Sequence, residues 1–216
     1  MDSSYYTKAK KVAASIARHP RVLFPYLKYL PTWGKGPIDY ELPWISFPAI
    51  NFIKRHLRPW HNVFEYGSGG STLWFARNSN SVLSVESDSD WHNQVCSRLT
   101  SRGIKNASCE LHPISGDSPS AFQSDSFFRR IEVSTWDVIL VDCYCGFSAS
   151  RYGLTRPYAL EIALHHLRPG GIVILDDSWM FKSSLEPKAG WRVEDFIGLG
   201  PCRYGVTSTA VFERLF

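Results

Sequence analysis

The chain has 216 residues, a net charge of +4, and 44% hydrophobic and 14% aromatic residues. This length suits one α/β domain with an extension, and the composition excludes a largely disordered protein. No apolar run approaches the roughly 18 residues of a membrane span. The odd number of cysteines and the lack of a leader pattern favour a reducing compartment. We therefore expect a cytoplasmic protein without a membrane span.

The N-terminal region predicts two short helices, over residues 4–18 and 22–30, which end at Pro20 and Pro31. All seven charged residues between positions 8 and 35 are basic, and the next acid is Asp39. Such an arm could contact an acidic substrate, a nucleic acid or a membrane surface. An ordinary apolar stripe opposite these charges favours a solvated helix face instead.

A Gly/Pro-rich stretch follows at residues 33–37, and a third helix is expected to end near Leu57. These signals divide the chain into an N-terminal helical arm or lid, residues 1–58, and a domain over residues 59–216. We expect aromatic side chains of the arm to line a ligand site, namely Trp33, Tyr40, Trp44 and Phe47.

Strands and helices alternate from residue 62 onward. The expected strands cover 62–66, 82–86, 107–111, 136–142, 171–176, 194–199 and 206–214, and the expected helices cover 71–78, 89–102 and 156–166. This alternation predicts a doubly wound α/β fold with a mostly parallel sheet of seven strands. The last two strands are joined by a short Gly-Pro turn, so we expect an antiparallel hairpin at the C-terminal edge.

A glycine-rich turn connects the first expected strand to its helix, with the sequence EYGSGGS at residues 65–71. Glycines let backbone approach a ligand closely and leave the helix amides free. Glu86 ends the next strand, where a carboxylate suits a ribose diol. Glu65, directly before the glycines, would repel a pyrophosphate but suit the ammonium of an amino acid moiety.

Four segments together resemble the motif series of class I S-adenosylmethionine-dependent methyltransferases: residues 65–71, 85–86, 137–142 and 167–176. They span more than half of the chain, in the family's order and with its gaps. The resemblance implies a Rossmann-like fold and S-adenosylmethionine as the methyl donor. In that family the first acid and the glycines hold the methionine end, the second acid holds the ribose, and the loop after the third strand lines the adenine.

By this resemblance the donor-binding residues are Glu65, Gly67, Ser68, Gly69, Ser71, Glu86, Asp117 and Asp142. An Asx turn would explain Asp117 nearly as well as an adenine contact. Ser71 stands where a third glycine is common, and we expect its hydroxyl to cap the helix. Trp91 would pack beside the adenine or serve in ordinary helix packing.

Asp142 and the pair Asp176-Asp177 end two strands that should be neighbours. Clustered carboxylates are costly without a cation, and Mg²⁺ takes several oxygen ligands. The arrangement resembles metal-dependent catechol-type O-methyltransferases, although Cys145 stands where those enzymes carry a catalytic Lys. All three aspartates are therefore candidate metal ligands, and Asp142 and Asp176 are the catalytic candidates. Alternatively, they contact donor, substrate or solvent.

Arg151, Tyr152 and Arg156 follow the loop after Asp142, where an acceptor would enter. A guanidinium there suits a carboxylate or phosphate on the acceptor, or pairs with the nearby acids.

These residues predict a methyltransferase acting on a small molecule, at oxygen rather than nitrogen. A donor-binding or regulatory module with the same fold and no chemistry is the alternative. A nicotinamide-dependent oxidoreductase is disfavoured by Glu65 and by the antiparallel ending. We do not expect a nucleic-acid substrate, because no compact basic patch interleaved with aromatics lies in the catalytic half. A homodimer is compatible with the sequence.

Overall fold

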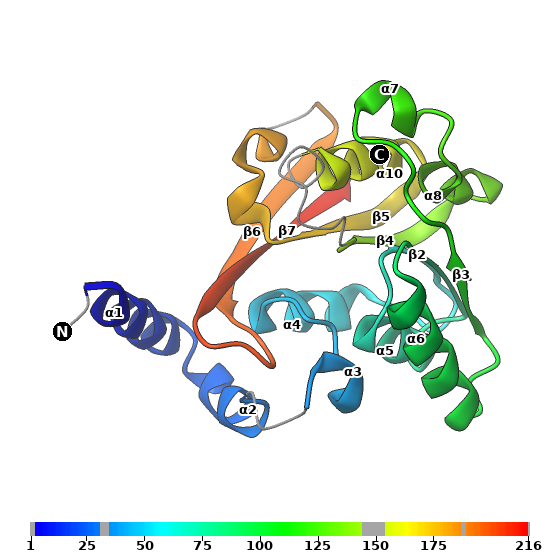
Figure 1. The fold of residues 1–216 in the computed structure, drawn as a ribbon. Coiled ribbons are helices and arrows are strands. Elements are labelled where there is room, and N and C mark those ends of the chain that lie inside the picture. The colour runs from blue at the N-terminus through cyan, green and yellow to red at the C-terminus, as the bar shows by residue number, and fades with distance from the viewer. Residues whose placement is uncertain (1–2, 31–34, 144–153, 187–188, 216) are drawn as a thin grey trace.

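The computed structural model describes residues 3–30, 35–143, 154–186 and 189–215. Its strands are β1 Asn62–Tyr66, β2 Ser81–Glu86, β3 Ala107–Leu111, β4 Trp136–Val141, β5 Leu167–Asp176, β6 Trp191–Leu199 and β7 Val206–Arg214. They form one seven-stranded sheet in the order β3-β2-β1-β4-β5-β7-β6. The first five strands run parallel, and β7 pairs antiparallel with both β5 and β6 (Figure 1). The predicted fold class is confirmed.

The helices include each one that the sequence predicts. The longer ones are α1 Ser3–Arg18, α4 Phe47–His56, α5 Gly70–Ala76, α6 Ser89–Ser101 and α10 Thr155–His165. The short ones are α2 Leu23–Lys28, α3 Pro37–Tyr40, α7 Pro119–Phe122 and α8 Ser126–Arg129, with 3-10 turns at Pro20–Val22, Arg130–Val133, Ser178–Met180 and Lys182–Leu185. Helices α3, α7 and α8 escaped prediction because four residues are too few to display a helical period. Among the described residues, no helix combines the length and the apolar character that crossing a membrane requires.

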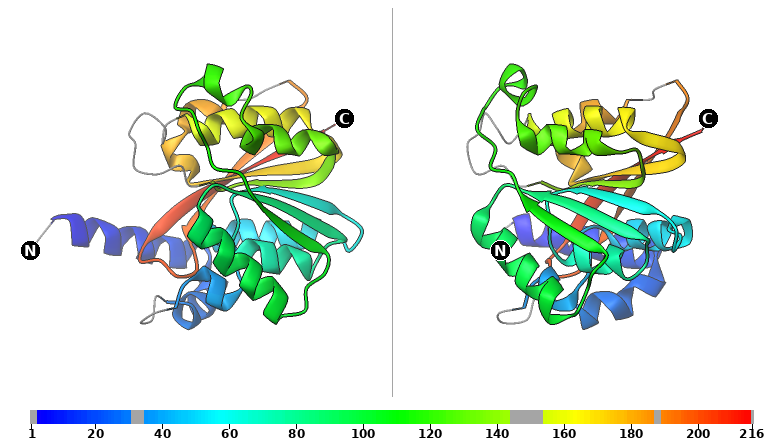
Figure 2. Two further views of the ribbon diagram at one scale, coloured as in Figure 1. Left: turned by 45° about the vertical axis from the view of Figure 1, so that its right-hand side comes forward. Right: turned by 90° about the vertical axis from the view of Figure 1, so that its right-hand side faces the viewer.

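The sheet lies between two helical layers, as Figure 2 shows. Helices α4 and α5 cover one face, and α8 and α10 cover the other. Consecutive residues of β4 therefore enter different clusters: Val138 and Leu140 pack with α4 and α5, whereas Ile139 and Val141 pack with α8 and α10. Burial on both faces explains why β4 is a continuous apolar run.

The N-terminal helices pack against the rest of the chain. Helices α1 and α4 contact β6 and β7, and α3 contacts α5. Buried Glu41, just after α3, pairs with Arg77 and, at 2.6 Å, with Arg102. The residues before α4 are thus bonded to the ends of α5 and α6. The division of the chain at residue 58 stays a prediction.

Candidate functional site

The turn between β1 and α5 is shaped by contacts that only glycine permits. Gly67 has a φ of +94°, and a Cβ there would lie 2.8 Å from the carbonyl oxygen of Asp142. A Cβ on Gly70 would lie 2.4 Å from the carbonyl oxygens of Pro37 and Leu42. Backbone atoms therefore exclude a side chain at both positions, and the turn is held between the end of β4 and the segment before α4.

The start of α5 differs from the prediction. The Gly69 amide donates to Thr72 Oγ1 at 3.1 Å, so the hydroxyl that bonds the start of the helix belongs to Thr72, the third helical residue. Ser71 lies inside the first helical turn, with its hydroxyl beside the Glu65 carboxyl. The predicted Ser71 cap is wrong because the helix begins at Gly70, one residue earlier than expected.

Glu65, within β1, is a fully buried carboxyl with one unused oxygen. Its Oε2 accepts from Ser84 Oγ at 2.5 Å, whereas Oε1 is buried and has no hydrogen-bond partner among the described residues. Burial raises the pKa of Glu65 to about 7, although neighbouring hydroxyls, Ser71 foremost, oppose the shift. A buried acceptor without a partner is destabilising, so a donor group supplied by a ligand would be favourable here.

Glu86, at the end of β2, holds the glycine turn. Its Oε2 accepts from the Ser68 amide at 3.0 Å and from Ser68 Oγ at 2.9 Å. Its Oε1 accepts from the Ser87 amide at 2.7 Å and the Asp88 amide at 3.1 Å. An ionised carboxylate offers about four acceptor positions, and these four bonds occupy them. A ribose diol would have to replace one of them, and only the Ser68 hydroxyl can rotate away.

Trp91, in the first turn of α6, lies over the glycine turn. Its Nε1 donates to the Ser68 carbonyl at 2.7 Å, and its ring lies 3.5 Å from where a Cβ on Gly69 would be. Asp88 caps α6 by accepting from the Trp91 amide at 2.7 Å. The indole thus both packs on the turn and lines the cavity beside it.

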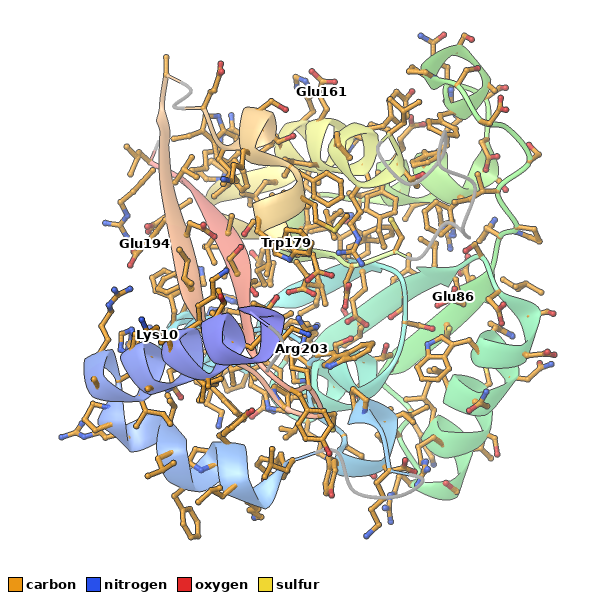
Figure 3. All side chains as sticks on the ribbon, turned by 60° about the vertical axis from the view of Figure 1, so that its left-hand side comes forward. Lys10, Glu86, Glu161, Trp179, Glu194 and Arg203 are labelled. Carbon is orange, nitrogen blue, oxygen red and sulfur yellow. The ribbon has the colours of Figure 1, made fainter. Side chains whose placement is uncertain are left out.

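That cavity, which we call the acidic cleft, has a volume of about 810 Å³. Among the described residues its walls carry two arginines, Arg156 and Arg203, and six acids: Glu86, Asp88, Asp90, Asp142, Asp176 and Asp177. Figure 3 shows Trp179 and Arg203 on the side toward α1 and Glu86 on the side toward α6.

The predicted donor-binding residues fall into three groups. Ser68, Glu86 and Asp142 line the acidic cleft. Glu65, Gly67, Gly69 and Ser71 form or support the turn beside it. Asp117 is exposed and is not among the described lining residues, so the expected adenine contact gains no support.

Two buried or mostly buried arginines hold the three aspartates at the ends of β4 and β5. Arg156 Nη2 donates to Asp142 Oδ1 at 2.8 Å, and its Nη1 donates to Asp177 Oδ2 at 3.4 Å. Arg203 Nη1 donates to Asp177 Oδ1 at 3.4 Å, and its Nη2 lies 3.7 Å from Asp176 Oδ2. The alternative in which Arg156 pairs with nearby acids is the one observed.

The three aspartates differ in acidity. Burial raises the pKa of Asp142 to about 6, against the lowering effect of Arg156. Burial, with Asp142 and Asp177 nearby, raises the pKa of Asp176 well above its ordinary value. Burial also tends to raise the pKa of Asp177, but the positive charges of Arg156 and Arg203 outweigh it, so the pKa of Asp177 is lowered. Asp177 is therefore the firmly ionised member of the group.

The last strand supplies hydroxyls to the same aspartates. Thr209 Oγ1 donates to Asp176 Oδ1 at 2.9 Å, and Thr207 Oγ1 donates to Asp177 Oδ1 at 3.1 Å. Asp177 has a φ of +51°, a left-handed conformation that aspartate tolerates better than most residues. The hydroxyls of β7 thus help to fix Asp176 and Asp177, which together with Asp142 form what we call the acidic wall.

The predicted Mg²⁺ site gains no support. Guanidinium groups already balance these carboxylates, and the three aspartates do not bring ligand atoms within 4.8 Å of one another. In the part of the chain that the structure describes, the one group of three with that spacing is His92, Cys96 and Cys109. It contains none of the predicted metal ligands, and Cys145 lies outside the described residues.

Sequence reasoning missed Arg203, which lies in the turn between β6 and β7. Besides its contacts with aspartates, it donates to the Trp44 carbonyl at 2.8 Å and lies 5.0 Å from the centroid of the Trp44 ring. The available signal was a basic residue in a hairpin turn next to the strand ending in Asp176-Asp177. Trp44 does line the cleft, whereas Trp33, Arg151 and Tyr152 lie outside the described residues.

No protein-family model and no curated protein matches the sequence. Among solved structures, the O-methyltransferase TomG of Streptomyces achromogenes, involved in tomaymycin synthesis and bound to S-adenosylmethionine, matches with a TM-score of 0.61 at 13% identity, over 100% of both chains. A candidate O-methyltransferase from Klebsiella pneumoniae matches with a TM-score of 0.60 at 17% identity, over 97% of this chain and 100% of its own. An rRNA methylase from Streptococcus thermophilus matches with a TM-score of 0.55 at 14% identity, over 86% of this chain and 100% of its own. The chain therefore has the fold of class I S-adenosylmethionine-dependent methyltransferases.

Proposed function

We propose that this protein transfers a methyl group from S-adenosylmethionine to an oxygen atom of a small molecule. The observation that carries the proposal is the buried Glu65 Oε1 without a partner, directly before the glycine turn. The fold adds support, because a structural neighbour with this architecture is bound to that donor.

The chemistry of the site fits such a donor. The donor's ammonium would supply the hydrogen bond that Glu65 Oε1 lacks. Its positively charged sulfonium suits a cleft with six carboxylates against two guanidinium groups. A volume of about 810 Å³ lies within the usual range of ligand pockets.

Asp142 is the residue we assign to proton removal. The bound donor supplies a methyl carbon attached to a sulfonium. As the acceptor oxygen forms its bond to that carbon, the carbon–sulfur bond breaks, its electron pair stays on sulfur, and Asp142 receives the hydroxyl proton. The Asp142 side chain is 24% exposed and has a raised pKa, whereas the Asp176 side chain is 2% exposed. Asp142 is thus the more accessible base, with Arg156 holding its orientation.

Calorimetry with S-adenosylhomocysteine tests donor binding. We expect binding to the native protein, and about tenfold weaker binding for Glu65→Gln and Glu86→Gln, because each loses a charged acceptor. Glu132→Gln is the matched control, since Glu132 forms an exposed ion pair with Arg129. Absence of binding to the native protein would overturn the proposal.

Turnover needs a separate assay, with labelled donor and a pool of small-molecule acceptors. We expect labelled ethers or esters, and Asp142→Asn should lower kcat far more than it changes KM. Label found only in RNA, or only on nitrogen, would contradict the acceptor class.

A non-catalytic donor-binding module is the second candidate. The observation that favours it is that Asp142, the proposed base, is already paired with Arg156 at 2.8 Å. Binding of S-adenosylhomocysteine without label transfer to any acceptor in the pool would support this candidate over the first.

A further inference from the structure

A second cavity, which we call the basic cavity, adjoins the acidic cleft. Its volume is about 660 Å³, and residues of α1, β6, β7 and the 3-10 turns after β5 line it. The two cavities share Trp179, Val206 and Thr207 as lining residues. The two cavities are therefore adjacent, and a molecule lying over these three residues would contact both.

The charge of the basic cavity is opposite to that of the cleft. Lys11 and Arg18 of α1 and Lys182 line it, and none of the three belongs to an ion pair between described residues. Asp195 is the one acid among the described lining residues, and it accepts from Ser178 Oγ at 2.6 Å. The cavity therefore has an excess of unpaired positive charge.

Ser15, also in the lining, is a buried hydroxyl without a partner. It is 6% exposed, and its Oγ makes no hydrogen bond to any described residue. By contrast, Ser208 Oγ in the same cavity lies 2.6 Å from Ser178 Oγ. An oxygen of an anionic ligand would supply the missing partner and would at the same time meet the lysine and arginine side chains.

We propose that the basic cavity binds an anionic group of the acceptor, a phosphate or a carboxylate, while the acceptor's hydroxyl lies in the acidic cleft. The assignment to an acceptor rests on the proposed function, whereas anion binding does not. Six carboxylates in the cleft would repel the anionic end and leave it to the basic cavity, so the two cavities together would orient the acceptor.

Nuclear magnetic resonance titration with inorganic phosphate and, separately, acetate tests the proposal. We expect the amide signals of Ser15 and Thr207 to shift with added anion. The double variant Lys11→Gln/Arg18→Gln should raise the Kd about tenfold, and Ser15→Ala about threefold. Lys8→Gln is the matched control: Lys8 is an exposed residue of α1 outside the cavity lining, so the Kd should change less than twofold. Preference for phosphate or acetate identifies the acceptor's group.

Three outcomes would overturn the inference. The first is no shift at Ser15 and Thr207 with either anion. The second is an equal loss of affinity in Lys8→Gln and the double variant, which would indicate diffuse surface charge. The third is that single-stranded RNA binds more tightly than phosphate and depends on Lys8 as much as on Lys11, which would indicate a nucleic-acid surface.

Donor affinity separates failure of this inference from failure of the proposed function. The double variant should bind S-adenosylhomocysteine as the native protein does, which also verifies folding. If phosphate binds as expected but S-adenosylhomocysteine does not bind the native protein, the anion site stands and the methyltransferase proposal fails. If S-adenosylhomocysteine binds and neither anion does, the methyltransferase proposal stands and the anion site fails.

Discussion

The acidic cleft and the basic cavity share one wall but differ in how their charges are satisfied. In the cleft, Arg156 and Arg203 bond the aspartates at the ends of β4 and β5. In the basic cavity, Lys11 and Arg18 belong to no ion pair between described residues. A charged group that is paired within the protein contributes to the stability of the fold. A charged group without such a partner can bind a ligand of opposite charge.

The contrast follows from where the two cavities are built. The acidic cleft lies where parallel strands end, so three of its charged residues, Glu86, Arg156 and Asp176, are buried by neighbouring elements. The basic cavity lies where α1 rests on the hairpin of β6 and β7, so its lysine and arginine side chains project into solvent. Substitutions in the cleft should therefore affect stability, and those in the basic cavity should affect binding alone.

Arg156→Met should have the largest effect on stability. It removes the buried guanidinium that bonds the partly buried Asp142 and Asp177, so the loss should approach the roughly 3–5 kcal/mol of breaking a buried pair. Urea unfolding measures this loss. Arg129→Gln, which breaks an exposed pair, should cost less than about 1 kcal/mol. If Lys11→Gln/Arg18→Gln cost as much as Arg156→Met, the contrast between the cavities would be wrong.

Glu65 should make stability fall as pH rises. The folded-state pKa of about 7 exceeds the ordinary value of 4.5, so the folded protein retains a proton that the unfolded chain releases between these values. The free energy of unfolding should drop by up to about 3 kcal/mol from pH 4.5 to 7.5. Glu65→Gln should remove the part of this slope that Glu65 contributes, and the remainder should come from Asp142 and Asp176, whose pKa values are also raised. Parallel pH curves for the two proteins would contradict the buried-carboxyl account.

Gly70→Ala tests how tightly the turn beside the cleft is held. The new Cβ would meet two carbonyl oxygens at 2.4 Å, and such overpacking costs about 1–3 kcal/mol. Gly36→Ala is the control, because nothing lies within 4 Å of its Cβ position. Thermal or urea unfolding of both variants checks the difference. Equal stabilities would mean that the segment before α4 shifts to accommodate the new Cβ at little cost in free energy.

Ser15→Ala should have the smallest effect on stability. The hydroxyl has no partner, so its removal should change the free energy of unfolding by less than about 1 kcal/mol. Ser46 is the matched comparison: its Oγ accepts from the Ala49 amide and donates to the Phe196 carbonyl at 2.8 Å. Ser46→Ala should cost about 1–2 kcal/mol. A larger loss for Ser15→Ala would show that its hydroxyl already has a structural partner.

The sequence predicted the central sheet because local patterns determine it. The apolar runs of β4 and β5 indicate burial on both faces, and the Gly-Pro turn before β7 indicates a hairpin. The glycine turn was also readable, because its glycines and Glu65 are adjacent in the chain. Prediction was weaker at the start of α5, where the hydroxyl that bonds the helix start belongs to Thr72 and not to Ser71.

The sequence predicted that Asp142 would lie near Asp176 and Asp177, and the pairing of β4 with β5 agrees with this. The side chains that bond these aspartates were beyond sequence reasoning because they come from long-range contacts. Arg203 reaches Asp176 and Asp177 because β7 lies between β5 and β6 in the sheet. No local sequence pattern reveals this strand order. From the sequence a metal ion was one candidate for balancing these carboxylates, whereas in the structure guanidinium groups contact them. The basic residues of α1 were evident in the sequence, and their role stays a prediction. Ser15, which lies among them, carries no signal in the sequence.

The pairing of β5 with β7 also bears on how the protein is made. Thr209 lies opposite Asp176 in the sheet, donates to its carboxylate, and accepts from the Ser46 amide at 3.1 Å. On the ribosome, Asp176 and Asp177 emerge well before Thr207 and Thr209. Until β7 follows, the nascent chain carries these carboxylates without the hydroxyls that hold them, so the acidic wall is among the last parts of the molecule to form.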